Sequence, residues 1–309
     1  MTRFSHQRSA TYFRVSTLGN RDAQNASAPG GYLDPESNPL SACLEHHDKW
    51  RKLRPCHGSE IEHVRRFVTY AKHCLDQAGY YPPVNAHRYM VALALYSKCI
   101  TVAEAVLALI DAGFGDEAFA MTRTLVDVFI TLRYITNKDT DDRAKRYAHF
   151  TAKESEQWEK VAREFWPQNP TPALSTKTKQ LAATFPHPHK WSGKTVWEMA
   201  TEEDAFENDP STGKPLVHSF AYRVVYRWTS LYVHPTVGAL WNHLVQAGRD
   251  VFKVRSGDRR DMRHMALFNT AAYLSNTMVT FYRCMGDPQP SRLGTWSGAI
   301  MAHLARRHG

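Results

Sequence analysis

Residues 219–234 combine side chains suited to acid–base chemistry with side chains suited to binding an anion. The segment reads SFAYRVVYRWTSLYVH and is followed by Pro235. At about 100° per residue of an α-helix, one stripe carries Ser219, Arg223, Tyr226, Arg227, Ser230 and His234. The other positions are mostly apolar, which predicts a helix that is buried on most sides. Because unpaired buried charge is costly, the stripe is predicted to be a structural polar network or a functional site.

His234 and Arg227 are the residues of this stripe best suited to catalysis. The residue before a proline is biased away from helical geometry, so His234 should end the helix, where the helix C-terminus favours a cation. An imidazole can move the proton of a 2′-hydroxyl while a guanidinium stabilises charge on the phosphorus, and no metal is needed. We therefore predict His234 and Arg227 as catalytic, with Arg223 and Ser230 beside them. The alternative is a structural histidine bonded to Ser230 or to a backbone carbonyl.

Two further predicted helices repeat this pattern of charge and tyrosine among apolar residues. Over 116–137 one face carries Asp116, Arg123, Asp127 and Tyr134, and Arg123 and Asp127 are spaced to pair. Over 140–166 one face carries Arg143, Tyr147, Phe150, Glu154 and Trp158. If the stripes converge inside a bundle, they form either an ion-pair and tyrosine network that fixes helix register or a ligand pocket. The predicted network or ligand-binding residues are Arg123, Asp127, Tyr134, Arg143, Tyr147, Tyr222 and Tyr226.

Two groups of residues contain side chains that could bind a metal ion. The pattern C-x2-H-H-x8-C-H, formed by Cys43, His46, His47, Cys56 and His57, matches no standard zinc spacing. Glu60-x-x-His63 is half of a di-iron motif, and Asp261-x-x-His264 is only a loose second half. The sequence also lacks phosphate-binding and nucleophile-elbow motifs. We therefore predict no metal and no cofactor. Trp191-Ser192-Gly193 could cap a pocket, although a packing tryptophan on a turn is commoner.

The elements that would position these residues are helical. Hydrophobic periodicity and capping signals, including Ser59-x-x-Glu62 and Thr195-x-x-Glu198, predict an all-α bundle of six to eight helices over 59–309. Residues 1–58 are predicted to form a disordered or draped arm. Strands are not expected, and the helix predicted after Pro235 spans 237–247. The other predicted helices cover 59–79, 86–112, 174–185, a segment after 195, 259–285 and 296–307.

The amino-acid composition bears on the partners and the cellular location expected of the protein. The net charge of +9 permits a polyanionic partner such as RNA, but Lys and Arg are scattered among acids, which also fits a solvated basic surface. The five cysteines include no C-x-x-C, which indicates reduced thiols in a cytoplasmic protein. No uninterrupted apolar run reaches about 18 residues, so we expect no membrane span.

The chain resembles DUF5677, a bacterial all-helical family of unknown function. Residues 117–127, EAFAMTRTLVD, and 132–135, LRYI, look like its central helix. Its second signature, a tyrosine-rich helix ending in Ser-x-x-x-His-Pro, is matched by Tyr222, Tyr226, Ser230, His234 and Pro235. The similarity covers about 93–241, and Asp127 stands where the family usually has Glu. The resemblance implies an all-helical fold and no specific activity.

A second similarity is to HEPN ribonucleases of toxin and defence systems. Their motif is an arginine followed four to six residues later by a histidine, in a helix that pairs across a dimer. Arg227-x6-His234 fits at the long limit, although Trp228 stands where a polar residue is usual. This resemblance implies a homodimeric, metal-independent RNA endonuclease. The alternative is a non-enzymatic sensor or interaction protein that binds a small anionic ligand at Arg123, Asp127 and Tyr226.

Overall fold

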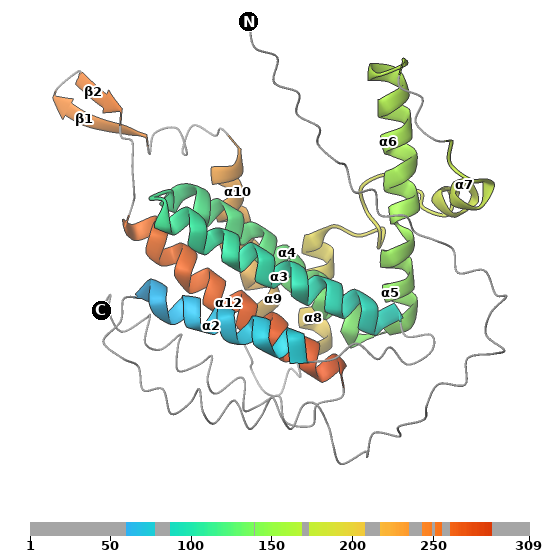
Figure 1. Cartoon of the computed structure of the whole chain (residues 1–309), viewed down its shortest axis with the longest axis horizontal. Coiled ribbons are helices and arrows are strands. Elements are labelled where there is room, and N and C mark those ends of the chain that lie inside the picture. Colours follow the sequence, from blue (N-terminus) through green and yellow to red (C-terminus); the bar gives the residue numbers. More distant parts are fainter. Residues whose placement is uncertain are drawn as a thin grey trace, which may run out of the picture. The chain divides into compact units, whose positions relative to one another are not determined.

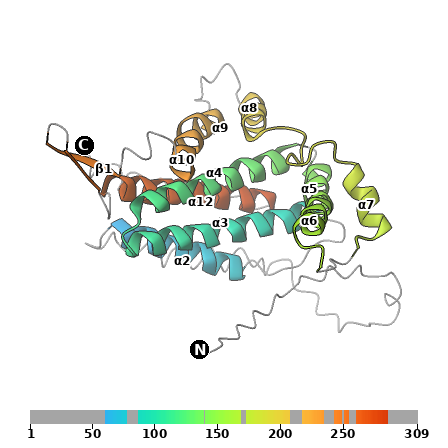
Figure 2. The ribbon, with the colours of Figure 1, turned by 90° about the horizontal axis from the view of Figure 1, so that it is seen from above.

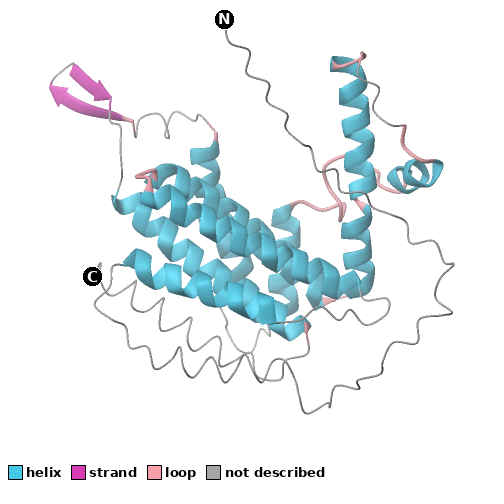
Figure 3. Cartoon of the chain, in the orientation of Figure 1, coloured by secondary structure: helices cyan, strands magenta, loops and turns pink. Residues whose placement is uncertain are grey.

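The computed structural model describes residues 60–77, 87–138, 140–168, 173–207, 217–234, 243–248, 251–254 and 260–285. All of them belong to one compact unit, Pro39–Gly309. Helices dominate these residues (Figure 3), so the predicted all-α fold is confirmed. The predicted arm at 1–58 and the predicted helix at 296–307 lie outside the described residues.

The helices lie close to their predicted positions. In chain order they are α2 (Glu60–Gln77), α3 (His87–Asp111), α4 (Gly115–Asn137), α5 (Thr140–His149), α6 (Thr151–Phe165), α7 (Thr176–Ala183), α8 (Val196–Glu207), α9 (Val217–Phe220), the π-helix η1 (Ala221–Tyr226), α10 (Arg227–Val233) and α12 (Arg260–Cys284). Two strands, β1 (Leu244–Gly248) and β2 (Val251–Val254), precede α12.

The core lies among α2, α3, α4 and α12, which pack side by side (Figures 1 and 2). The link between α3 and α4 is short, as predicted, and Gly113 adopts the positive φ of 83° that an L side chain rarely takes. This link makes α3 and α4 an antiparallel pair. The largest fully buried side chains include Phe67, Tyr70, Tyr96, Phe119, Leu125, Ile130, Leu267 and Phe281.

Helix α3 is apolar on nearly all sides. Among the described residues, α3 alone is long and apolar enough to cross a membrane, and half of its apolar window is buried in the bundle. The core helix of a bundle meets the same criteria of length and composition. Its packing against α2, α4 and α12 accounts for that composition.

The single helix predicted over 140–166 is two helices, α5 and α6, with Phe150 between them. The Phe150 ring is buried and packs edge-on against Phe185, with 5.3 Å between ring centroids. The Thr151 hydroxyl donates to the Ala148 carbonyl across the junction at 2.9 Å. The Phe150 backbone keeps helical φ and ψ of −62° and −21°, and its N–H donates to the Arg146 carbonyl at 3.1 Å, so α5 and α6 follow one another with a one-residue junction.

The capping box predicted at Thr195 is confirmed at the start of α8. The Glu198 backbone N–H donates to Thr195 Oγ1 at 3.2 Å, and the Thr195 backbone N–H donates to Glu198 Oε2 at 2.6 Å. The hydrogen bonds that the Thr195 backbone N–H and hydroxyl donate to the carboxylate lower the pKa of Glu198. The two reciprocal bonds satisfy two backbone donors that the helix itself leaves unpaired.

The predicted helix over 237–247 is wrong where the structure describes it. Residues 244–248 form β1, which pairs antiparallel with β2; Leu244 lies opposite Val254, and the register shifts between Gln246 and Gly248. Val245, Val251, Phe252 and Val254 have the branched or aromatic side chains that favour strands. Gly248 disfavours continuation of a helix.

Candidate functional site

The helical segment 217–234 is not buried on most sides, contrary to the prediction. Arg223, Arg227 and His234 are exposed, and so are large apolar side chains beside them, including Phe220 at 59% and Trp228 at 42% exposure. Ser219, Ala221, Val225 and Thr229 form the buried side. The charged side chains therefore meet solvent, and burial does not require them to have protein partners.

The π-helix explains part of this error. Its hydrogen bonds span five residues instead of four, so its wider turns shift side chains away from the positions that 100° per residue predicts. The Arg227 backbone N–H, for example, donates to the Tyr222 carbonyl. The Ser230 hydroxyl donates to the Tyr226 carbonyl at 2.6 Å, so the alternative in which the His234 side chain is bonded to Ser230 is not seen.

The exposed side of η1 and α10 is called the arginine face here. It comprises Phe220, Arg223, Val224, Arg227, Trp228, Leu231 and His234. No Asp or Glu occurs in residues 219–234. The Arg223 guanidinium lies 4.6 Å from the Trp197 ring centroid, whereas the side chains of Arg227 and His234 have no hydrogen bond or ion pair to any described residue. The face thus presents positive charge and aromatic rings with no opposing carboxylate of its own.

A second group of predicted residues meets between α4 and η1. Arg123 Nη2 donates to Tyr226 Oη at 2.7 Å, and the guanidinium lies 4.6 Å from the Tyr226 ring centroid. The Tyr222 and Tyr226 rings stack with centroids 4.8 Å apart. Arg123 therefore bonds Tyr226, and no ion pair forms with Asp127 within 4.0 Å in the described structure. The sequence left open whether the stripes converge, and here Arg123 of α4 and Tyr226 of η1 do meet.

Asp127 lines a cavity of about 630 Å³. Burial raises the pKa of its carboxyl to about 6, and the charge of Arg123 opposes that rise. Tyr147, Tyr222 and Tyr226 line the same cavity, together with the predicted pocket residue Trp191. A carboxyl that titrates near neutrality inside an aromatic cavity is typical of functional sites.

Tyr147 and Trp191 form the wall contributed by α5 and the loop before α8. Their rings meet edge to face with centroids 5.1 Å apart. Burial raises the pKa of Tyr147, and the charges of Glu154 and Asp127 raise it further. The Trp191 carbonyl accepts from Arg146 Nε at 2.7 Å, which fixes the loop to α5.

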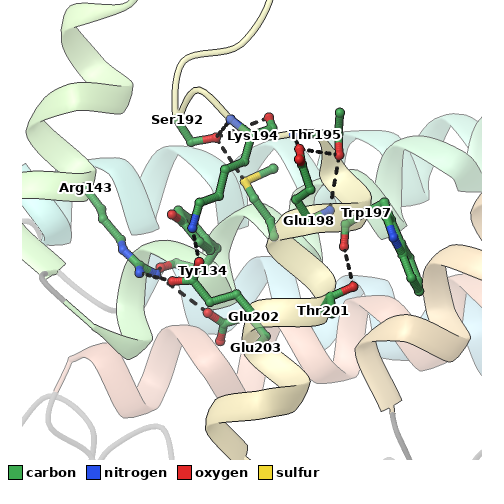
Figure 4. Close-up of polar contacts among 11 residues, drawn as sticks. Tyr134, Arg143, Ser192, Lys194, Thr195, Trp197, Glu198, Thr201, Glu202 and Glu203 are labelled. Atoms are coloured by element: carbon green, nitrogen blue, oxygen red, sulfur yellow. Dashed lines mark hydrogen bonds and ion pairs between the residues drawn. The ribbon is translucent and has the colours of Figure 1, made fainter.

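Tyr134 and Arg143 lie in a separate polar network with α8 (Figure 4). Arg143 donates to the Tyr134 carbonyl and to Glu202 Oε1, each at 2.5 Å, and its guanidinium lies 3.7 Å from the Tyr134 ring centroid. Glu202 also binds Lys194. Burial opposes ionisation of Glu202, but hydrogen bonds from Lys194 and Arg143 lower its pKa. The network ties α4, α5 and the loop before α8 together.

The acidic run Glu202-Glu203-Asp204 was missed by sequence reasoning, although three successive acids on a helix are a visible signal. Glu203 is 1% exposed and accepts from Asn137 at 2.6 Å; burial raises its pKa, and Arg133 opposes this. Asp204 accepts from the backbone N–H groups of His218 and Ser219. The run therefore anchors the start of α9, which leads into the arginine face.

Asp127 also lines a second cavity, of about 450 Å³. Its polar lining includes Arg123 together with Asp116, Glu117 and Asp127, and His243 also reaches it. One arginine among three acids does not favour a small anion. The expectation of an anionic ligand at Arg123, Asp127 and Tyr226 thus gains no support from the charges around it.

The candidate metal residues are only partly described. Glu60 and His264, from the two loosely matched motifs, do meet, with His264 Nδ1 and Glu60 Oε2 3.1 Å apart. Within the described ranges no three His, Cys, Asp or Glu side chains are placed to hold a metal ion. The Cys43–His57 group lies outside those ranges. Among the described residues, Cys74, Cys99 and Cys284 form no disulfide.

Comparison with known families supports the first resemblance. A model described as "Family of unknown function (DUF5677)" matches residues 89–251, more than half of the chain. The chain belongs to this family. The match spans the central helix α4 and the helix ending at His234, the two signatures that suggested it. Comparison with the curated proteins and with the solved structures finds no match. The similarity to HEPN ribonucleases has no support from these comparisons.

Proposed function

We propose that this DUF5677 protein binds single-stranded RNA on the arginine face and cleaves it without a metal. The observation that supports the proposal is the exposure of Arg223, Arg227, His234 and Trp228 on one acid-free helical surface. Arginines neutralise phosphates, and exposed aromatic rings stack on unpaired bases. The net charge of +9 also favours binding of a polyanion such as RNA.

In the proposed reaction, the neutral imidazole of His234 removes the proton from a ribose 2′-hydroxyl. The 2′-oxygen attacks the adjacent phosphorus, and the bond from phosphorus to the 5′-oxygen breaks. The leaving 5′-oxygen takes a proton from water, and the His234 imidazolium returns its proton to water, which gives a 2′,3′-cyclic phosphate and a 5′-hydroxyl. Arg227 stabilises the negative charge that builds up on the phosphorane oxygens. The exposed position of His234 leaves it accessible to a polymer.

A homodimer would complete this site. Arg227 and His234 are seven residues apart, about 10 Å along a helix, and helical side chains tilt toward the N-terminus. The Arg227 side chain therefore tilts away from His234 of its own chain. Antiparallel pairing of two α10 helices near Leu231 would bring Arg227 of one chain to His234 of the partner subunit. The half-exposed Leu231 and Val224 supply apolar surface for such pairing.

Cleavage of a fluorescent single-stranded RNA in EDTA tests the proposal. The wild type should yield fragments with 2′,3′-cyclic ends, and His234→Ala should abolish cleavage while RNA binding is retained. His243→Ala is the matched control because His243 is also exposed but lies outside the arginine face. Intact RNA with folded wild-type protein, or equal loss in both variants, would contradict the proposal.

Mixing two inactive variants tests the shared site. If Arg227 and His234 act across a dimer, Arg227→Ala mixed with His234→Ala should recover about a quarter of wild-type activity, because half of the dimers are mixed and each has one intact site. Each variant alone should stay inactive. Failure of the mixture to recover activity, with subunit exchange verified by size-exclusion chromatography of tagged chains, would place both residues in one chain.

For Tyr134 and Arg143 we infer a structural role in place of ligand binding. Arg143 is bound by Glu202 and by a backbone carbonyl, and its side chain is only 12% exposed. These contacts support the alternative of a polar network that fixes helix register, for this part of the site.

A further inference from the structure

The cavity of about 630 Å³ beside α4 has walls rich in aromatic rings. They come from four parts of the fold: α5, the α5–α6 junction, the loop before α8, and η1. The rings belong to Tyr147, Phe150, Trp191, Tyr222 and Tyr226. The volume is within the range of small-molecule sites. The faces of such rings carry negative electrostatic potential, so they attract cations.

Asp127 supplies the charged group of this cavity. It is half-buried, and its side chain forms no hydrogen bond or ion pair with any residue that the structure describes. Burial of the carboxyl raises its pKa to about 6, which means that the protein provides little compensation for its negative charge. A ligand that carries positive charge would provide that compensation.

The lining also includes the basic side chains of Lys194, His189 and Lys190, and Arg123 lies near Asp127. Lys194 binds Glu202, and Arg123 donates to Tyr226. His189 is exposed, and Lys190 is half-buried. Glu154, a second carboxylate in the lining, is exposed. Asp127 is thus the half-buried carboxylate of a lining rich in aromatic rings.

We propose that this cavity binds a small organic cation, with its ammonium or guanidinium group against Asp127 and its apolar part among Tyr147, Trp191 and Tyr222. The site is separate from the arginine face and does not depend on RNA cleavage. The proposed ligand is a cation, whereas the sequence alone suggested an anionic ligand.

Isothermal titration calorimetry with three probes of similar size tests the proposal. They are phenethylamine, phenethyl alcohol and phenylacetate, which differ mainly in charge. At pH 7.5 the amine should bind at least about tenfold more tightly than the alcohol, and phenylacetate should bind most weakly. Equal binding of amine and alcohol, tighter binding of phenylacetate, or absence of amine binding at millimolar concentration would each overturn the proposal.

Variants then locate the binding site. Asp127→Asn should weaken phenethylamine binding by about tenfold or more and leave binding of the alcohol unchanged. Asp142→Asn on α5 is the matched control, because Asp142 is exposed and outside the cavity. Tyr147→Phe should retain binding and Tyr147→Leu should weaken it, since the ring and not the hydroxyl is the proposed contact. Circular dichroism checks that each variant is folded. A folded Asp127→Asn protein with unchanged amine affinity would place the ligand elsewhere.

Discussion

Replacing Asp204 with alanine should lower the free energy of unfolding by about 3 kcal/mol, because two charge-assisted hydrogen bonds of about 1.5–3 kcal/mol each are lost and their donors stay buried. Asp204 Oδ1 accepts from the His218 backbone N–H at 2.9 Å, and Oδ2 accepts from the Ser219 N–H at 2.6 Å. The carboxylate is 4% exposed, and His218 and Ser219 are buried as well. Water therefore cannot easily replace the lost acceptor.

Urea denaturation at pH 7 measures this effect. Asp204→Asn should lose less than Asp204→Ala, since the amide oxygen can still accept one of the two hydrogen bonds. Thr201→Ala is the control on the same helix, because the exposed Thr201 hydroxyl bonds only the Trp197 carbonyl one turn earlier. Hydrogen exchange should also be faster over 218–226 in Asp204→Ala. Wild-type stability in Asp204→Ala would mean that α9 is held by its other contacts.

Helix positions were largely predictable because their signals are local. The pair Thr195 and Glu198 marks the start of α8, and Gly113 marks the turn between α3 and α4. Each signal acts within one turn of backbone, so a single sequence contains it. The one-residue junction at Phe150 has no such signal, because its backbone remains helical.

The error over 219–234 has a different cause. Apolar residues on every side of a helix predict burial only if enough neighbouring elements exist to cover them. Here the described neighbours α4 and α8 cover one side, where Ala221, Val225 and Thr229 lie. The π-helix adds a second error, because side-chain positions were predicted with α-helical geometry.

The sequence indicated polar residues that face the interior of the bundle, but it did not indicate which of them contact one another. The α4 stripe does reach Tyr226, yet Tyr134 and Arg143 lie in a different network from Arg123. Arg143 belongs to that other network because it binds Glu202, which is far from Arg143 in the sequence. Partners at such separations follow from tertiary packing, and periodicity within one helix does not indicate them.

Asp127→Asn should stabilise the protein at pH 8 by about 2–3 kcal/mol, because a rise of about two pKa units corresponds to that much differential free energy. The folded-state pKa is about 6, above the ordinary value of 3.8, so folding favours the protonated carboxyl. At pH values well below 3.8 the carboxyl is protonated in both states, and the substitution should have no effect. The wild type then loses stability as pH rises through 4–6, and the loss is complete above about 6.

Urea denaturation from pH 4 to pH 8 gives the unfolding free energies of Asp127→Asn and of the wild type. The difference between them reports the titration of Asp127, because both proteins contain all the other titratable groups. Asp142→Asn, which removes an exposed carboxylate outside the cavity, is the control variant over the same range. A flat difference for Asp127→Asn, or destabilisation at pH 8, would show that the carboxylate is well compensated in the folded state.

The expected stabilisation by Asp127→Asn is consistent with a binding role for the cavity. The carboxylate that is proposed to bind a cation lowers the stability of the protein while no cation is bound. Such a loss of stability is common where function requires a charge without a partner. Phenethylamine should correspondingly raise the melting temperature of the wild type more than that of Asp127→Asn.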